Sequence, residues 1–265
     1  MELNKIYHRD CYEAIKEISD KSIDLIITDP PYDIPGIHGA GIMASRKAGS
    51  FMKDIESTEL HVGLDMLILD EFVRVSKKIN CYIWCNKKML LPLIKFFVEK
   101  HSCNYEIIIW AKDSPIPFCG THYLVDKEYC LYFWEEGAPI HIPFERANTV
   151  YFTKKNIVDK NDYGHPTIKD LEITKNFVLN SSKENDVVLD TFMGSGTTAV
   201  ACKQTGRQFI GFEINDEYHK IAVDRLNGIN QKGEMNLFET DFDKVYEQIN
   251  LFEEGENNDV KTRND

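Results

Sequence analysis

The feature that most constrains the fold is a regular alternation of two kinds of segment along the 265-residue chain. Short apolar runs rich in β-branched and aromatic residues predict strands at 5–8, 23–28, 80–85, 105–111, 129–134, 186–190 and 207–212. Between them, apolar residues three and four apart predict helices at 11–19, 62–78, 87–101, 168–182, 196–205 and 215–227. Such alternation is typical of an α/β fold, so we expect a mostly parallel seven-stranded sheet with helices on both faces.

The chain is long enough for one large core, and we predict a single domain over residues 1–250. Two long segments interrupt the alternation, at 33–58 and 136–164, and loops of this length in compact domains are usually functional or mobile. The last residues, 251–265, are acidic and resemble a solvated, disordered tail.

The formal net charge of −12 argues, taken alone, against a partner as anionic as nucleic acid. Part of that charge lies in the tail, and a local basic surface can exist within an acidic total. The segments 44–53 and 151–160 are the candidates for one. The charged start of the chain and the lack of an 18-residue apolar run predict a cytoplasmic protein without a membrane segment.

The seven cysteines are odd in number, are scattered through apolar segments and include no C-x-x-C pair, so we expect buried free thiols. Cys81 and Cys85 lie four apart, but no further Cys or His stands at the spacing that a metal site needs. We therefore predict no metal site.

A strand, a glycine turn, a helix and a second strand follow one another in "DVVLDTFMGSGTTAVACKQTGRQFIGFEIN". Gly194 and Gly196 allow a sharp turn near a ligand, and Ser195 and Thr197 can satisfy donors at the helix start. Glu213 ends the second strand at the spacing from which an acid reaches ribose hydroxyls. A nucleoside-containing cofactor is favoured over a turn that only packs helix on strand. A nicotinamide dinucleotide stays a rival, because "GSGTTA" fits its fingerprint too.

The tetrapeptide Asp29-Pro30-Pro31-Tyr32 ends the second predicted strand. Prolines cannot donate ladder hydrogen bonds, so they end the strand at the carboxyl edge of the sheet, where α/β folds bind ligands. A carboxylate, a free carbonyl and a flat ring would then converge on one small volume. Two acceptors and a stacking surface suit a planar group that carries an NH₂.

These residues resemble the D/N/S-P-P-Y/F motif of the β-group DNA amino-methyltransferases, which use S-adenosylmethionine. The resemblance implies a Rossmann-like methyltransferase fold, circularly permuted so that the catalytic motif precedes the cofactor motif. It also implies that Asp29 and the Pro30 carbonyl accept hydrogen bonds from the amine of a flipped base, while Pro31 shapes the turn and Tyr32 stacks on the base. No covalent intermediate is needed, so no cysteine needs to act as nucleophile.

Three further segments, together with Glu213, are similar to motifs of that family over residues 4–227. "LDTFMGSGTTA" resembles its cofactor motif, "HPTIKD" its H-P-T-x-K-P segment, and "RDCYEAI" a segment whose acid lies near the cofactor adenine. The resemblance thus implies a cofactor site formed by Asp10, His165, Pro166, Thr167, Lys169, Asp190, Phe192, Gly194, Ser195, Gly196, Thr197 and Glu213. Thr191 and Asp170 replace prolines of the family pattern, which puts only local loop geometry in doubt.

The predicted reaction is methyl transfer from S-adenosylmethionine to N6 of a flipped adenine in double-stranded DNA. The aspartate form of the tetrapeptide favours adenine by analogy, with N4 of cytosine as the alternative. A nicotinamide oxidoreductase or a non-catalytic DNA-binding module are more distant alternatives. The segment 33–58 would be a catalytic loop and 136–164 a small target-recognition insertion. The sequence leaves open the recognition site, a homodimer, which is common in that family, and a cognate restriction endonuclease.

Several residues near these motifs have a structural alternative. Asp33 is interpreted as a loop acid, and the three tryptophans as core residues because they lie in strand-like runs. Lys112 follows a predicted strand and is assigned equally to the active-site edge and to solvent.

Overall fold

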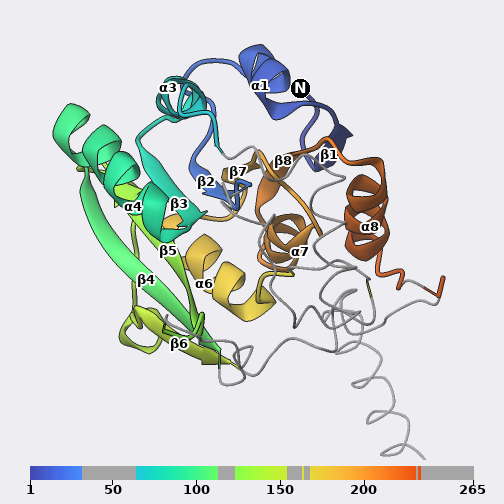
Figure 1. Ribbon diagram of the computed structural model, residues 1–265. Helices are drawn as coiled ribbons and strands as arrows, with labels where there is room; N and C mark the ends of the chain where they lie inside the picture. Colours follow the sequence, from blue (N-terminus) through green and yellow to red (C-terminus); the bar gives the residue numbers. More distant parts are fainter. Residues whose placement is uncertain (32–63, 113–122, 154–162, 164–167, 231, 234–265) are drawn as a thin grey trace, which may run out of the picture.

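The computed structural model describes residues 1–31, 64–112, 123–153, 163, 168–230 and 232–233 (Figure 1). Several sequence predictions lie outside these residues: Tyr32, the loop 33–58, Cys119, His165, Pro166, Thr167 and the tail 251–265. The insertion 136–164 is described over 136–153 and at residue 163.

The described residues form an eight-stranded sheet in the order β1-β8-β7-β2-β3-β5-β4-β6. Its strands are β1 Lys5–His8, β2 Leu25–Thr28, β3 Asn80–Cys85, β4 Asn104–Lys112, β5 Lys127–Trp134, β6 Val150–Thr153, β7 Val187–Asp190 and β8 Gln208–Glu213. β1, β8, β7, β2 and β3 pair in parallel, β5 is antiparallel to both β3 and β4, and β6 is parallel to β4. The expected α/β fold with a mostly parallel sheet is confirmed.

The sequence predicted seven of these strands and missed β6, which lies inside the 136–164 insertion. β6 is an edge strand beside β4, and its residues are exposed or half-buried. Its sequence therefore lacks the continuous apolar run that marks the buried strands.

The helices are α1 Cys11–Ala14, α3 Ile68–Val75, α4 Lys87–Ile94, α6 Leu171–Ser181, α7 Thr197–Gln204 and α8 Asp216–Leu226. Short 3₁₀ turns occupy Ile15–Glu17 and Phe144–Arg146, and a π-type turn, Lys95–Lys100, continues α4. All six predicted helices are present, but most are shorter than their periodic patterns. The first, for example, is divided between α1 and the 3₁₀ turn that follows it.

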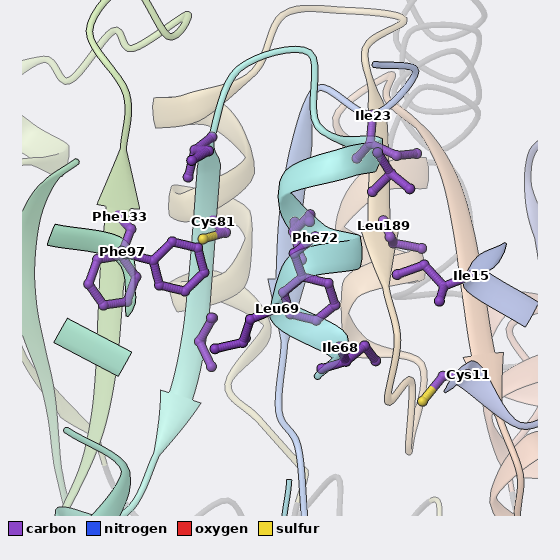
Figure 2. Close-up of a cluster of buried hydrophobic side chains, with 14 of the residues drawn as sticks. Cys11, Ile15, Ile23, Ile68, Leu69, Phe72, Cys81, Phe97, Phe133 and Leu189 are labelled. Carbon is purple, nitrogen blue, oxygen red and sulfur yellow. The ribbon is translucent and has the colours of Figure 1, made fainter. Parts of the chain in front are cut away.

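Two apolar clusters sandwich the sheet because successive strand residues point to opposite faces. On β3, Cys81 and Ile83 join one cluster, with α1, α3 and α4 covering it. Figure 2 shows part of this cluster, with Phe72 of α3 and Phe97 among its side chains. Tyr82 and Trp84 of the same strand join the other cluster, under α6, α7 and α8 (Figure 1). The helices thus cover both faces of the sheet, and the ends of the strands are available to form a site.

The three tryptophans lie in or against the core, as predicted. Trp84 and Trp110 are buried in the second cluster, and the half-buried Trp134 packs against it. Six of the seven cysteines are buried free thiols, which confirms that prediction for the described residues.

Candidate active site

The parallel strands bring the two predicted motifs to one edge of the sheet. β2 and β7 are parallel neighbours with Ile26 opposite Leu189, so the residues that follow each strand emerge side by side. The hydroxyl groups of Thr28 and Thr191 are 3.0 Å apart and buried, which joins the two strand ends. The tetrapeptide and the glycine turn, far apart in sequence, therefore begin next to each other.

Asp29 follows β2 directly and presents its carboxylate at this edge. Its Oδ2 is 2.6 Å from Nζ of Lys169, and about a quarter of its side chain is exposed. Pro30 is buried and Pro31 half-buried. The acid and the first proline thus lie where the motif predicts them, while Tyr32 is outside the described residues.

A chain of alternating charges continues from Asp29 into the antiparallel part of the sheet. Nζ of Lys169 also donates to Oε2 of Glu128 at 2.9 Å, and Lys112 donates to the other oxygen of Glu128. We call Asp29, Lys169, Glu128 and Lys112 the charge chain. Lys112, for which the sequence left two alternatives, faces the active-site edge.

The strand directions explain why the chain can form. Glu128 lies near the start of the antiparallel strand β5, and its register partner is Trp110 of β4. The start of β5 therefore meets the carboxyl ends of β3 and β4. Lys169 Nζ lies 5.0 Å from the ring centroid of Trp84, and Lys112 Nζ 4.4 Å from that of Trp110. These rings give both ammonium groups a cation–π contact.

The charge chain shifts the pKa values of its members. Burial acts to lower the pKa of Lys169, but the carboxylates of Asp29 and Glu128 outweigh it and hold that pKa above its usual value. Burial acts to raise the pKa of Glu128, and the two lysines outweigh it and lower that pKa to about 2. Both groups are therefore charged at neutral pH.

The glycine turn has the backbone geometry that its sequence predicts. Gly194 and Gly196 have φ values of 52° and 80°, in the left-handed region that glycine adopts without steric cost. A Cβ on Gly196 would lie 3.0 Å from the backbone of Ala222, so a side chain there would also push against α8. The turn leads from β7 into α7, which begins at Thr197.

Glu213, at the end of β8, fixes this turn by a hydrogen bond to its backbone. Its Oε2 accepts from the Gly194 N–H at 2.8 Å, and its Oε1 accepts from the Asn215 N–H at 2.8 Å. Burial raises the pKa of Glu213, and these backbone hydrogen bonds oppose the rise. Each carboxylate oxygen has a second lone pair with which it can accept from a ribose hydroxyl.

Asp190 is a second buried acid, at the end of β7. Burial raises its pKa to about 7, and the nearby Asp29 carboxylate adds to the rise. Hydrogen bonds from Thr198 and from the Phe192 N–H act in the opposite direction. Burial thus favours the protonated form of Asp190, and a cation placed beside it would favour its charged form.

The other predicted cofactor residues lie around the same edge. Asp10 follows β1 and caps α1 by accepting from the Tyr12 N–H at 2.8 Å. Its neighbour Arg9 donates its backbone N–H to the Glu213 carbonyl, so Asp10 lies near the end of β8. Phe192 is half-buried against the first cluster and touches the Tyr12 ring. His165, Pro166 and Thr167 remain predictions, because they lie outside the described residues.

The two departures from the family pattern have local roles in the structure. Thr191 contributes the hydroxyl that bonds to Thr28. Asp170 caps α6 by accepting from the Ile173 N–H at 3.0 Å. Each departure thus makes a side-chain hydrogen bond that a proline could not make.

Comparison with known proteins identifies the family. A family model described as DNA methylase matches residues 23–224, most of the chain. The chain belongs to this DNA methylase family. It is therefore an S-adenosylmethionine-dependent DNA amino-methyltransferase, and the nicotinamide and non-catalytic alternatives are set aside.

Individual relatives match along most of their length. The chain is 30% identical over 243 residues to the type II methyltransferase M2.LlaDCHI of Lactococcus lactis subsp. cremoris, covering 84% of this chain and 88% of the relative. It is 29% identical to the DNA adenine methyltransferase YhdJ of Escherichia coli K12, covering 85% and 83%. The crystal structure of the M1.HpyAVI-SAM complex superposes with a TM-score of 0.61 at 27% identity, covering 84% of this chain and 98% of that one.

The residues of this methylase fit its cofactor. Asp190, Glu213 and Asp10 place three carboxylates at neighbouring strand ends around a glycine turn. Carboxylates are suited to bind the ribose hydroxyls and the ammonium group of S-adenosylmethionine, and the turn lets the cofactor approach the backbone. No group of three or more metal-ligating side chains occurs among the described residues. Within the same residues, no helix combines the length and apolar character that crossing a membrane requires.

Sequence reasoning missed two charged residues of this region, the partly buried Glu128 and the buried Arg225. Glu128 begins a strand and looks like an ordinary solvated acid, because its partners are 16 and 41 residues away in sequence. Arg225 of α8 is buried, and its Nη1 donates to Thr197 Oγ1 at 2.8 Å beneath the glycine turn. The one sequence signal for Arg225 was the presence of an arginine at a core-facing position of an amphipathic helix.

Proposed function

We propose that this methylase transfers a methyl group to N6 of a flipped-out adenine in double-stranded DNA, with Asp29 and the Pro30 carbonyl as the groups that hold the amine. The parallel pairing of β2 with β7 carries the proposal, because it places Asp29 next to the glycine turn. The DNA adenine methyltransferase YhdJ, at 29% identity, supports adenine rather than cytosine.

Asp29 and Pro30 would act on the lone pair of the amine. In adenine this lone pair is delocalised into the ring, which makes the nitrogen a poor nucleophile. Two acceptors that bind its two hydrogens favour a tetrahedral nitrogen whose lone pair points outward. Positioning and fixed electrostatics then lower the barrier, and no covalent intermediate with the protein is required.

When bound, S-adenosylmethionine would supply an electrophilic methyl carbon for the amine nitrogen, and its sulfur would keep the electron pair of the C–S bond. The nitrogen would then release one proton to solvent, and the Asp29 carboxylate would stay ionised throughout. Tyr32 would stack on the flipped base, and Pro31 would fix the backbone between the Pro30 carbonyl and Tyr32.

The cofactor would occupy the other side of the edge. We assign Glu213 to the ribose hydroxyls, Asp10 to the neighbourhood of the adenine, and Asp190, Phe192 and the turn 194–197 to the methionine portion and adenosine. His165, Pro166, Thr167 and Lys169 are proposed for the methionine end. These residues belong to one domain over 1–250, with 136–164 as a small recognition insertion.

Methyl transfer to plasmid DNA, followed by mapping of modified bases with single-molecule sequencing, tests the proposal. We expect N6-methyladenine at a defined sequence. Asp29→Ala should lower the rate by at least about a hundredfold, while calorimetry shows cofactor affinity retained. N4-methylcytosine as the product would contradict the choice of base, and an active Asp29→Ala variant would contradict the catalytic assignment.

Partners beyond DNA are a separate proposal. Several relatives are named type II methyltransferases, M2.LlaDCHI and M.BglII of Bacillus subtilis among them. A cognate restriction endonuclease and a homodimer are therefore the partners to look for. Plasmid DNA methylated by this protein can be challenged with candidate endonucleases, and sedimentation gives the oligomeric state.

A further inference from the structure

The charge chain includes two residues, Glu128 and Lys112, that belong to none of the recognised motifs. Both lie on the antiparallel strands β4 and β5, outside the part of the sheet that holds the cofactor motif. Their partner Lys169 was assigned from its motif to the methionine end of the cofactor. The structure gives its ammonium group different contacts, with Asp29 on one side and Glu128 on the other.

We propose that Glu128 is a positioning residue for methyl transfer, which acts through Lys169 to fix the orientation of the Asp29 carboxylate. This inference rests on the proposed role of Asp29. It adds a residue that the motifs do not contain. This residue is a glutamate on the antiparallel strand β5, and it contacts the lysine on the side opposite to the catalytic acid.

Geometry supports an orienting role. Lysine has a flexible four-carbon stem, so an ammonium group at the end of it is poorly positioned unless several partners fix it. Here two carboxylate oxygens lie at 2.6 and 2.9 Å from Nζ, and the Trp84 ring lies 5.0 Å away. The side chain of Lys169 is only 12% exposed, so little water competes for these contacts.

Charge balance supports the same role. Two acids and two bases alternate along the charge chain. The formal charge of these four residues is therefore zero, and each carboxylate touches a lysine. Without Glu128, Asp29 would be the one remaining member of the charge chain in contact with Lys169. The ammonium group could then follow Asp29 and compete with the amine of the base for the same oxygen. Lys112, at the end of β4, in turn donates to Glu128 and so helps to fix the position of that carboxylate.

A double-mutant cycle tests the proposal, because residues that act through one another have non-additive effects. The variants are Glu128→Gln, Lys169→Met and the pair together, measured by steady-state methyl transfer to DNA. We expect Glu128→Gln to lower kcat by between about tenfold and a hundredfold, as misplacement of a reacting group does. In the Lys169→Met background the same change should cost less than about twofold.

The readouts separate positioning from binding and folding. KM for DNA and the cofactor Kd from calorimetry should stay within about twofold for Glu128→Gln, and Glu128→Asp should recover part of kcat because it restores the charge. Glu135→Gln is the matched control. Glu135 follows the other end of β5 and pairs with Lys78 at 2.9 Å on the surface. We expect unchanged kcat for that variant.

The outcomes distinguish the two proposals. A wild-type protein that transfers no methyl group to DNA would overturn the proposed function and this inference together. An active wild type with undiminished kcat in Glu128→Gln would overturn the inference alone. Equal losses in both backgrounds, or a loss that appears as weaker cofactor binding, would show that Glu128 does not act through Lys169 on Asp29, which also overturns it.

Discussion

On the cofactor side of the sheet, formed by β1, β8 and β7, the buried acids Asp190 and Glu213 accept hydrogen bonds from backbone N–H groups. On the catalytic side, formed by β2, β3, β5 and β4, Asp29 and Glu128 are paired with lysines. The pKa values differ accordingly. On the cofactor side burial raises the pKa of Asp190 and Glu213, whereas for Glu128 the two lysines together outweigh burial and lower the pKa.

This difference matches what each side has to bind. A buried acid without a cation is costly while it is charged, and a cationic or hydroxyl-bearing ligand relieves that cost. The cofactor side is therefore prepared for a ligand that carries donors. The catalytic side already contains its cations, and in the proposed function it presents a charged acceptor to a neutral amine. Strand direction produces the contrast, because the antiparallel strand β5 brings a glutamate to the edge where parallel strands end.

The largest expected effect that tests the contrast is on the cofactor side. Asp190→Asn should stabilise the protein at pH 8 by on the order of 2–4 kcal/mol, because it removes a buried charge. The folded pKa of about 7 lies above the ordinary value of 3.8, so ionisation destabilises the fold as pH rises through this window. The gain should therefore disappear near pH 4. Denaturant unfolding at the two pH values measures it, and a variant that is less stable at pH 8 would contradict the assignment.

The catalytic side should show the opposite sign. Glu128→Gln should destabilise the protein at pH 7 by on the order of 2–3 kcal/mol, because two partly buried lysines lose their shared carboxylate. The folded pKa of about 2 lies below the ordinary 4.5. The stabilisation is thus present above pH 4.5 and is lost as pH falls towards 2. Acid unfolding should show the wild type approaching the variant over that range.

The matched control for this measurement is Glu135→Gln. Its pair with Lys78 is more than a third exposed on both side chains, and exposed pairs contribute little. We expect a change below about 0.5 kcal/mol. A loss from this variant equal to that from Glu128→Gln would mean that the partly buried charge chain contributes no more stability than an exposed ion pair.

Most of the fold and part of this contrast could be predicted from the sequence. Strands such as 80–85 are buried on both faces, so their apolar runs are continuous, and the edge strand β6 was missed for the converse reason. The acids Asp29, Asp190 and Glu213 follow or end strands within motifs, which made them recognisable. Glu128 was not assigned a role and Lys112 was left with two alternatives, because the register of β5 against β4 brings them together and no local pattern encodes that register.

The smallest effect expected from a change at the candidate site concerns Glu213, the acid proposed for the ribose hydroxyls. Glu213→Gln keeps one carbonyl acceptor but introduces an NH₂ group where the carboxylate had a second acceptor. We expect the cofactor Kd to rise by about tenfold, the equivalent of one hydrogen bond to a charged group. At saturating cofactor, kcat should stay within about twofold, because Glu213 does not touch the charge chain. Calorimetry with S-adenosylmethionine and single-turnover methyl transfer measure the two quantities. A kcat loss larger than the loss of affinity would mean that the two sides of the sheet are coupled, and the contrast between them would then need another explanation.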